Sequence, residues 1–174
     1  MTTKHLITIV LILILFTHKN NITAQVSVGD KAPALSIEEW LKGEPVTNFE
    51  SGKVYLVEFW GTWCAPCIEN IPHLSSLQEK FASSLTIIGV ATHEFDGRDK
   101  LDNFMKKRGD EMRYTVAYDS DYSMQIDWDT GTKDGNNFRL PLCFLIDKTG
   151  TVLFAGHPAD ENLETLIEKA VKQH

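Results

Sequence analysis

After residue 27 the chain alternates between continuous apolar runs and segments whose apolar residues recur at helical spacing. The runs at 54–60 and 85–91 are rich in β-branched and aromatic residues, which is typical of buried strands in a parallel sheet. Between them, residues 65–82 predict a helix whose inward stripe is formed by Ile68, Ile71, Leu74 and Leu77. The domain therefore begins with a strand–helix–strand unit.

The second half of the chain continues this alternation and ends with an antiparallel pair of strands. We expect a helix at about 98–108 that ends at Gly109, then a strand at 114–118 and a long irregular loop at 119–139. A strand at 142–147, opened by Pro141, should follow and lead through a tight turn at 148–150 into a strand at 151–155. An amphipathic helix at 160–172 should end the domain. Residues 27–53 should add a short strand or hairpin. A parallel start and an antiparallel C-terminal hairpin predict an α/β fold, with a mixed β-sheet flanked by helices on both faces.

The N-terminus carries a different pattern. The apolar run at 6–16 is too short to cross a bilayer comfortably, but it fits the hydrophobic region of a signal peptide. Ile22 and Ala24 suit the −3 and −1 positions of a cleavage site. We therefore expect a signal peptide at 1–24 and one domain at 27–174, with an uncleaved membrane anchor as the alternative. The expected location is periplasmic or otherwise exported, without membrane insertion once the leader is removed.

Composition and charge narrow the class of protein. The chain has 174 residues, of which 43% are hydrophobic and 24% are charged, as in an ordinary globular domain. Its net charge of −7, without a pronounced basic cluster, argues against a nucleic-acid partner. Its three cysteines are too few for a small disulfide-stapled scaffold. Two of them are only three residues apart, a spacing that indicates redox chemistry in an exported protein.

The segment 59–67, Phe-Trp-Gly-Thr-Trp-Cys-Ala-Pro-Cys, places this pair where a strand turns into a helix. The helix dipole and the free backbone N–H groups at that point stabilise a thiolate, so the pKa of Cys64 should fall below the ~8.5 of a free thiol. Cys67, one turn later, should be buried against the helix. Cys64 would therefore attack a substrate disulfide and Cys67 would resolve the mixed disulfide. Pro66 suits the first helical turn and stiffens the geometry between the two sulfurs.

Residues 55–67, together with Pro141 and the segment 144–150, resemble the thioredoxin superfamily, and more narrowly its exported TlpA/ResA-type thiol–disulfide oxidoreductases. The likeness covers nearly the whole chain after residue 27 and implies a thioredoxin-like fold. It also implies that Pro141 is a cis-proline facing the cysteine pair. Glu58 would be a buried acid that assists proton transfer at Cys67. The substrate-binding residues implied are Trp63, Ala65, Pro66, Leu140 and Pro141.

One position departs from the pattern of these relatives. They commonly carry a glutamate three residues after the second cysteine, where this chain has Asn70. The neighbouring Glu69 points about 100° away on the helix, so it should not replace that acid. We therefore expect Glu58 to perform the acid–base role alone, with a pKa raised by burial. Glu58→Gln should then slow disulfide exchange near neutral pH while the fold survives.

The three cysteines admit other interpretations. A zinc site needs two more ligands, and the histidines offer no compact spacing to supply them, so we expect no metal and no cofactor beyond the Cys64–Cys67 disulfide. Cys143 should be a buried inert thiol, with a third redox partner as the alternative. A peroxiredoxin-like peroxidase would need Ser or Thr at Gly61 and Pro at Val57. A non-catalytic binding module of the same fold is disfavoured by the intact pair.

The expected function is two-electron exchange between the cysteine pair and protein thiols or disulfides, with an upstream thiol donor. The uncharged spacer of Ala65 and Pro66 favours a potential nearer thioredoxin, at about −270 mV, than the oxidant DsbA, at about −120 mV. The resemblance also implies a reductant, as in cytochrome c maturation or the repair of exported cysteines. The loop at 119–139, which carries Trp128, should influence the choice of partner.

Overall fold

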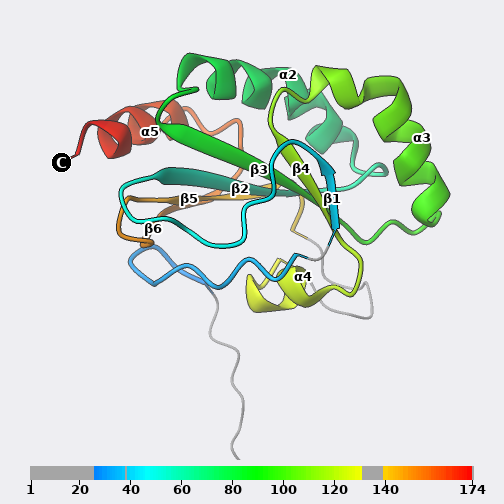
Figure 1. The fold of residues 1–174 in the computed structure, drawn as a ribbon, viewed down its shortest axis with the longest axis horizontal. Coiled ribbons are helices and arrows are strands. Elements are labelled where there is room, and N and C mark those ends of the chain that lie inside the picture. Colours follow the sequence, from blue (N-terminus) through cyan, green and yellow to red (C-terminus); the bar gives the residue numbers. More distant parts are fainter. Residues whose placement is uncertain (1–25, 38, 131–138, 174) are drawn as a thin grey trace, which may run out of the picture.

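The computed structural model describes residues 26–37, 39–130 and 139–173. Its centre is a six-stranded sheet in the order β1-β4-β3-β2-β5-β6 (Figure 1). The strands are β1 (Glu39–Lys42), β2 (Val54–Trp60), β3 (Leu85–Thr92), β4 (Thr115–Asp119), β5 (Leu142–Ile146) and β6 (Val152–Gly156). Strands β2, β3 and β4 are parallel, whereas β1, β5 and β6 are antiparallel to their neighbours. The predicted mixed sheet with its C-terminal hairpin is confirmed.

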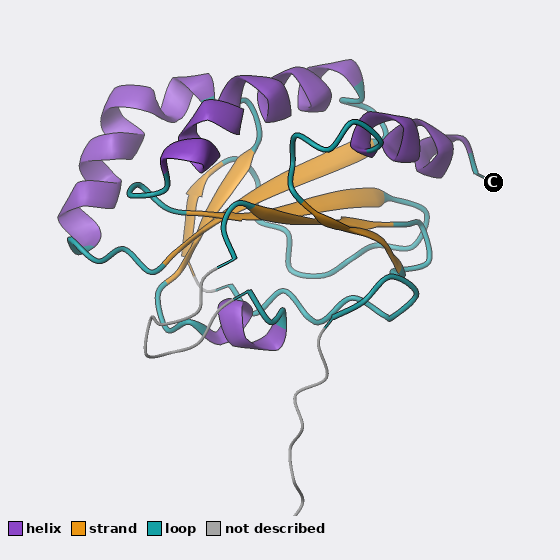
Figure 2. Ribbon diagram, turned by 180° about the vertical axis from the view of Figure 1, so that it is seen from behind, coloured by secondary structure: helices purple, strands orange, loops and turns teal. Residues whose placement is uncertain are grey.

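Helices cover both faces of the sheet, but unequally. The three long helices α2 (Ala65–Lys80), α3 (Arg98–Arg108) and α5 (Leu163–Lys172) lie on one face. The short helix α4 (Ser123–Asp127) lies on the other, together with the extended N-terminal segment (Figures 1 and 2). Strand β2 is buried along its whole length, which explains its continuous apolar run. Its alternating side chains supply the two separate cores on either side of the sheet.

Several predicted boundaries agree with the structure to within a few residues. Gly109 does end α3, but with φ of −57° it continues into the short 3₁₀ helix Gly109–Glu111 instead of adopting the left-handed conformation. The short strand expected within 27–53 is confirmed as β1.

The region predicted as an irregular loop at 119–139 contains helix α4. Five residues are too few to show helical periodicity, and tertiary contacts hold this helix in place. The buried Asp119 carboxyl accepts hydrogen bonds from the backbone N–H groups of Met124 (3.1 Å) and Gln125 (2.9 Å). Trp128 is fully buried against Phe59, so it is a core residue and not part of a partner-binding loop surface. Residues 131–138 lie outside the described part.

The predicted signal peptide at 1–24, like the alternative anchor, lies outside the described residues. Within the part of the chain that the structure describes, no helix is both long enough and apolar enough to cross a bilayer.

Candidate active site

Cys64 and Cys67 form a disulfide at the amino end of α2, directly after β2 (S–S 1.99 Å). Cys64 is the N-cap residue of the helix, and its Sγ accepts a hydrogen bond from the Cys67 backbone N–H at 3.3 Å. Ala65 and Pro66 fill the first helical positions, where the missing N–H of proline costs nothing, and both are exposed. The predicted placement of the pair at a strand-to-helix turn is therefore correct.

The two sulfurs differ in their surroundings in the way that divided roles require. Cys64 retains 5% exposure and lies at the N-terminus of a helix, whose dipole and free N–H groups favour the thiolate of the reduced form. Cys67 has 1% exposure and faces the core shared with Ile71 and Leu74. Cys64 is thus the sulfur better placed to meet a substrate, and Cys67 to resolve the intermediate.

Pro141 lies beside this turn. The Leu140–Pro141 peptide bond is cis, as the resemblance implied. In the antiparallel pairing of β2 with β5, Phe59 faces Leu142, so Pro141 comes level with the end of β2 that leads into Cys64. Leu140 is half-buried and packs against the core that contains both cysteines. The structure therefore brings Leu140 and Pro141 to the same edge of the sheet as Cys64.

Glu58 lies in the middle of β2 and is 99% buried on the face covered by α2. Burial raises the pKa of its carboxyl to about 8. Its sheet neighbours on that row are Gly89 of β3 and Cys143 of β5, both small. A buried acid with a pKa close to neutrality has the properties of a general acid–base group.

Asn70 occupies the position where relatives commonly carry a glutamate, and the structure gives it a different task. Its side-chain Nδ2 donates a hydrogen bond of 2.7 Å to the carbonyl of Pro66, which braces the cysteine loop. Glu69 is exposed, as its place on the helix predicted. Neither residue offers a buried carboxyl, which leaves Glu58 as the acid in this part of the core.

The structure adds an anchor for the cysteine turn that sequence reasoning missed. The Glu94 carboxyl accepts hydrogen bonds from the Thr62 backbone N–H (2.8 Å) and from the Thr62 hydroxyl. Trp63 donates its indole N–H to the carbonyl of His93 at 2.6 Å, and its ring lies 5.0 Å from that of the exposed Phe95. Because β2 and β3 are parallel, the residues following each meet at one edge, and this topology could have signalled the contact.

His93 follows β3, where the sequence favours a surface loop, but the structure buries it. It is 94% buried, with Nδ1 at 2.9 Å from Gln125 Oε1 and its ring stacked 4.4 Å from that of Tyr122. Its φ of 53° lies in the left-handed region, which is uncommon for a residue other than glycine. His157, in contrast, is exposed.

Glu94→Ala is expected to lower the free energy of unfolding by about 2 kcal/mol, because it leaves the Thr62 N–H without its charged acceptor in a nearly buried position. Glu94→Gln, whose amide can still accept one bond and donate the other, should lose markedly less. Urea denaturation of the three oxidised proteins measures the effect. Equal stability of Glu94→Ala and the unmodified protein would show that the anchor contributes nothing.

Cys143 lies on β5, is fully buried and keeps a free thiol. Burial, followed by the charge of Glu58, raises the pKa of this thiol well above its ordinary value. An un-ionised, inaccessible thiol is a poor nucleophile, so the structure agrees with the inert role predicted for it. Within the described ranges, no group of three or more His, Cys, Asp or Glu side chains is arranged to hold a metal ion.

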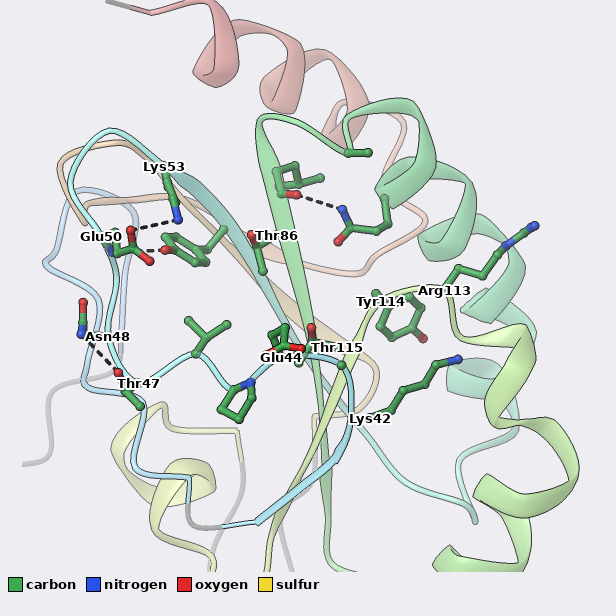
Figure 3. Close-up of a pocket in the computed structure, with 17 residues that line it drawn as sticks. Lys42, Glu44, Thr47, Asn48, Glu50, Lys53, Thr86, Arg113, Tyr114 and Thr115 are labelled. Carbon is green, nitrogen blue, oxygen red and sulfur yellow. Dashed lines mark hydrogen bonds and ion pairs between the residues drawn. The ribbon is translucent and has the colours of Figure 1, made fainter.

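A cavity of about 750 Å³ lies at the other end of the sheet from the cysteines. Its lining includes Lys53, which precedes β2, and Leu85 at the start of β3, whereas Cys64 follows the end of β2. Figure 3 shows Lys53 turned toward Glu50, with which it forms an ion pair at 2.9 Å. The cavity is therefore separate from the redox pair.

Comparisons with known proteins agree with this geometry. Residues 27–170 match the Redoxin family. The chain is 30% identical to the thiol–disulfide oxidoreductase ResA of Bacillus thuringiensis, over 83% of this chain and 79% of ResA. It is also 30% identical to protein FixW of Rhizobium leguminosarum, over 76% of this chain but only 62% of FixW.

Among solved structures, a thiol:disulfide interchange protein of the thioredoxin family from Chlorobium tepidum superposes with a TM-score of 0.63 at 26% identity, covering 83% of this chain and 98% of that one. The cysteine pair, the sheet order and these likenesses agree. The chain belongs to the Redoxin family, as a thioredoxin-fold member of the TlpA/ResA-type thiol–disulfide oxidoreductases.

Proposed function

We propose that this protein reduces disulfides of other proteins in the cell envelope. The observation that carries the proposal is the Cys64–Cys67 disulfide at the amino end of α2, with the more accessible sulfur at the helix N-cap. In the reduced form, the Cys64 thiolate attacks a substrate disulfide, forms a mixed disulfide and releases the first substrate thiolate. The edge formed by Trp63, Ala65, Pro66, Leu140 and Pro141 would receive the substrate backbone.

The second half of the reaction needs a proton acceptor for Cys67. Glu58 in its ionised form takes the proton of the Cys67 thiol, and the resulting thiolate attacks Cys64 Sγ. The second substrate thiolate leaves, and two electrons have passed from the pair to the substrate. The pair is then an intramolecular disulfide again, which an upstream thiol donor reduces for the next cycle.

The direction of electron flow follows from the residues between the cysteines. Ala65 and Pro66 bring no charge that would strongly stabilise the thiolate and turn the pair into an oxidant. Together with the signal peptide predicted at 1–24, this supports an exported reductant that acts on protein cysteines, as in cytochrome c maturation. Residues 1–24 would be removed on export or would remain as an anchor.

Two assays on the same preparation test this function. We expect the protein to catalyse the reduction of insulin by dithiothreitol and to leave the rate of hydrogen peroxide consumption at its background. Peroxide consumption without insulin reduction would replace the proposal with a thiol peroxidase. Inactivity in both assays would favour a binding module.

A further inference from the structure

Three buried side-chain atoms in the described residues lack a hydrogen-bond partner: Glu58 Oε1, Trp60 Nε1 and Tyr114 Oη. Buried polar atoms are nearly always paired in folded proteins, so each exception calls for an explanation. Glu58 and Trp60 are about 99% buried, and Tyr114 is 94% buried. Glu58 Oε1 is a carboxyl oxygen that can accept a hydrogen bond, whereas Trp60 Nε1 and Tyr114 Oη each carry a proton that they can donate.

The three residues that carry these atoms lie around one glycine, Gly89. In the parallel pairing of β2 with β3, Glu58 lies next to Gly89. A Cβ atom placed on Gly89 would lie 2.9 Å from Tyr114 Cε2 and 3.4 Å from Trp60 Nε1. The phenol ring and the indole N–H therefore occupy the space above the glycine, immediately beside the strand position of Glu58. The other neighbour of Glu58 in this row is Cys143, also a small residue.

The charge of Glu58 affects the titration of two neighbouring side chains, Tyr114 and Cys143. Burial first, and then the charge of Glu58, raise the pKa of the Tyr114 phenol. Burial, and then the charges of Glu58 and of Asp160, which precedes α5, raise the pKa of the Cys143 thiol. Burial alone raises the pKa of Glu58. From α3, Phe104 packs on Trp60 with 5.3 Å between ring centroids and brings no charge. Cys143 is thus the ionisable neighbour of Glu58 in its row of the sheet, and Tyr114 and Trp60 are the neutral hydrogen-bond donors.

The structure shows the oxidised pair, and burial favours the neutral form of Glu58 below its pKa of about 8. During resolution of the mixed disulfide, Glu58 must instead be ionised before it accepts the Cys67 proton. A buried carboxylate needs donors, because an unpaired one costs several kcal/mol or shifts to its neutral form. We infer that Tyr114 and Trp60 are positioning residues that donate hydrogen bonds to the Glu58 carboxylate and so set the pH at which it ionises. This inference rests on the acid–base role proposed for Glu58.

Tyr114→Phe tests the inference, because it removes the hydroxyl and keeps the ring. The Glu58 carboxyl of the reduced protein is titrated by ¹³C NMR after glutamate labelling, and Glu58→Gln identifies its signal. We expect the midpoint to rise by about one pH unit, a tenfold change in the ionisation constant. Trp60→Phe should shift it in the same direction. An unchanged midpoint in Tyr114→Phe would overturn the inference.

Tyr55→Phe is the matched control. Tyr55 is also buried on β2, but it faces the opposite core, where its hydroxyl accepts a bond of 3.2 Å from the Glu50 N–H. Loss of the Tyr55 hydroxyl should leave the titration midpoint of Glu58 unchanged. A shift in Tyr55→Phe equal to that in Tyr114→Phe would contradict a specific role for Tyr114. Because the titration reads Glu58 directly, its result is independent of insulin reduction. Failure of the proposed function would appear in the activity assays instead.

Discussion

Cys64→Ser is expected to reduce the rate of insulin reduction by about three orders of magnitude or more, as is usual when a catalytic nucleophile is removed. A serine hydroxyl stays protonated at neutral pH, so it cannot attack a disulfide even at the helix N-cap that favours the Cys64 thiolate. The fold should survive, because the substitution changes one atom at the N-cap of α2. The measurement is the turbidity that reduced insulin chains develop in the presence of dithiothreitol.

Two other cysteine variants sharpen this prediction. Cys67→Ser keeps the attacking sulfur and removes the resolving one, so it should accumulate a mixed disulfide with substrate that is visible by mass spectrometry. Cys143→Ala should retain the activity of the unmodified protein, since that thiol is free, buried and un-ionised. A loss of activity in Cys143→Ala equal to that in Cys64→Ser would contradict the division of roles.

Glu58→Gln is expected to remove a large part of the pH dependence of stability. The folded protein holds the Glu58 proton up to a pKa of about 8, whereas the unfolded chain releases it near 4.5. Between these values the folded state binds more protons, so the free energy of unfolding falls as the pH rises, by about 5 kcal/mol in total. Above pH 8 both states are ionised and the loss is complete. A neutral glutamine lacks this slope.

Urea denaturation of Glu58→Gln and of the unmodified protein, at a series of pH values between 4.5 and 8.5, gives the free energy of unfolding of each as a function of pH. The difference between these two curves separates the contribution of Glu58 from that of other titrating groups such as Asp119. The exposed Glu69 provides the control, because Glu69→Gln should follow the unmodified protein. Parallel curves for Glu58→Gln and the unmodified protein would show that Glu58 is not held neutral by burial. Disulfide exchange near pH 7 should also slow in Glu58→Gln, as expected for a missing proton acceptor.

The sequence predicted the fold and the redox pair well, because both depend on local signals. The run at 54–60 becomes β2 with the same bounds, and the segment 64–67 combines a strand end, a cysteine N-cap and a proline in the first turn. Each of these residues acts through its immediate neighbours in the chain. Pro141 could be assigned its cis bond only through the resemblance, since most X-Pro bonds are trans.

What the sequence could not reveal depends on contacts between distant residues. Helix α4 is followed by the buried Trp128, whose indole N–H donates to the carbonyl of Ala34, 94 positions earlier in the chain. The Glu94–Thr62 anchor joins residues 32 positions apart. Tyr114 lies over Gly89, which is the neighbour of Glu58 in the sheet, and only the strand order places these three residues together.

The central claim is that Cys64 and Cys67 form a two-electron couple with a reducing potential, and its most direct measurement is equilibration of the protein with dithiothreitol buffers of defined ratio. The free thiols of the pair are counted by mass spectrometry after alkylation. We predict a single two-electron transition near the value of thioredoxin, about −270 mV. A midpoint near that of DsbA, about −120 mV, would contradict the account and make the protein an oxidant.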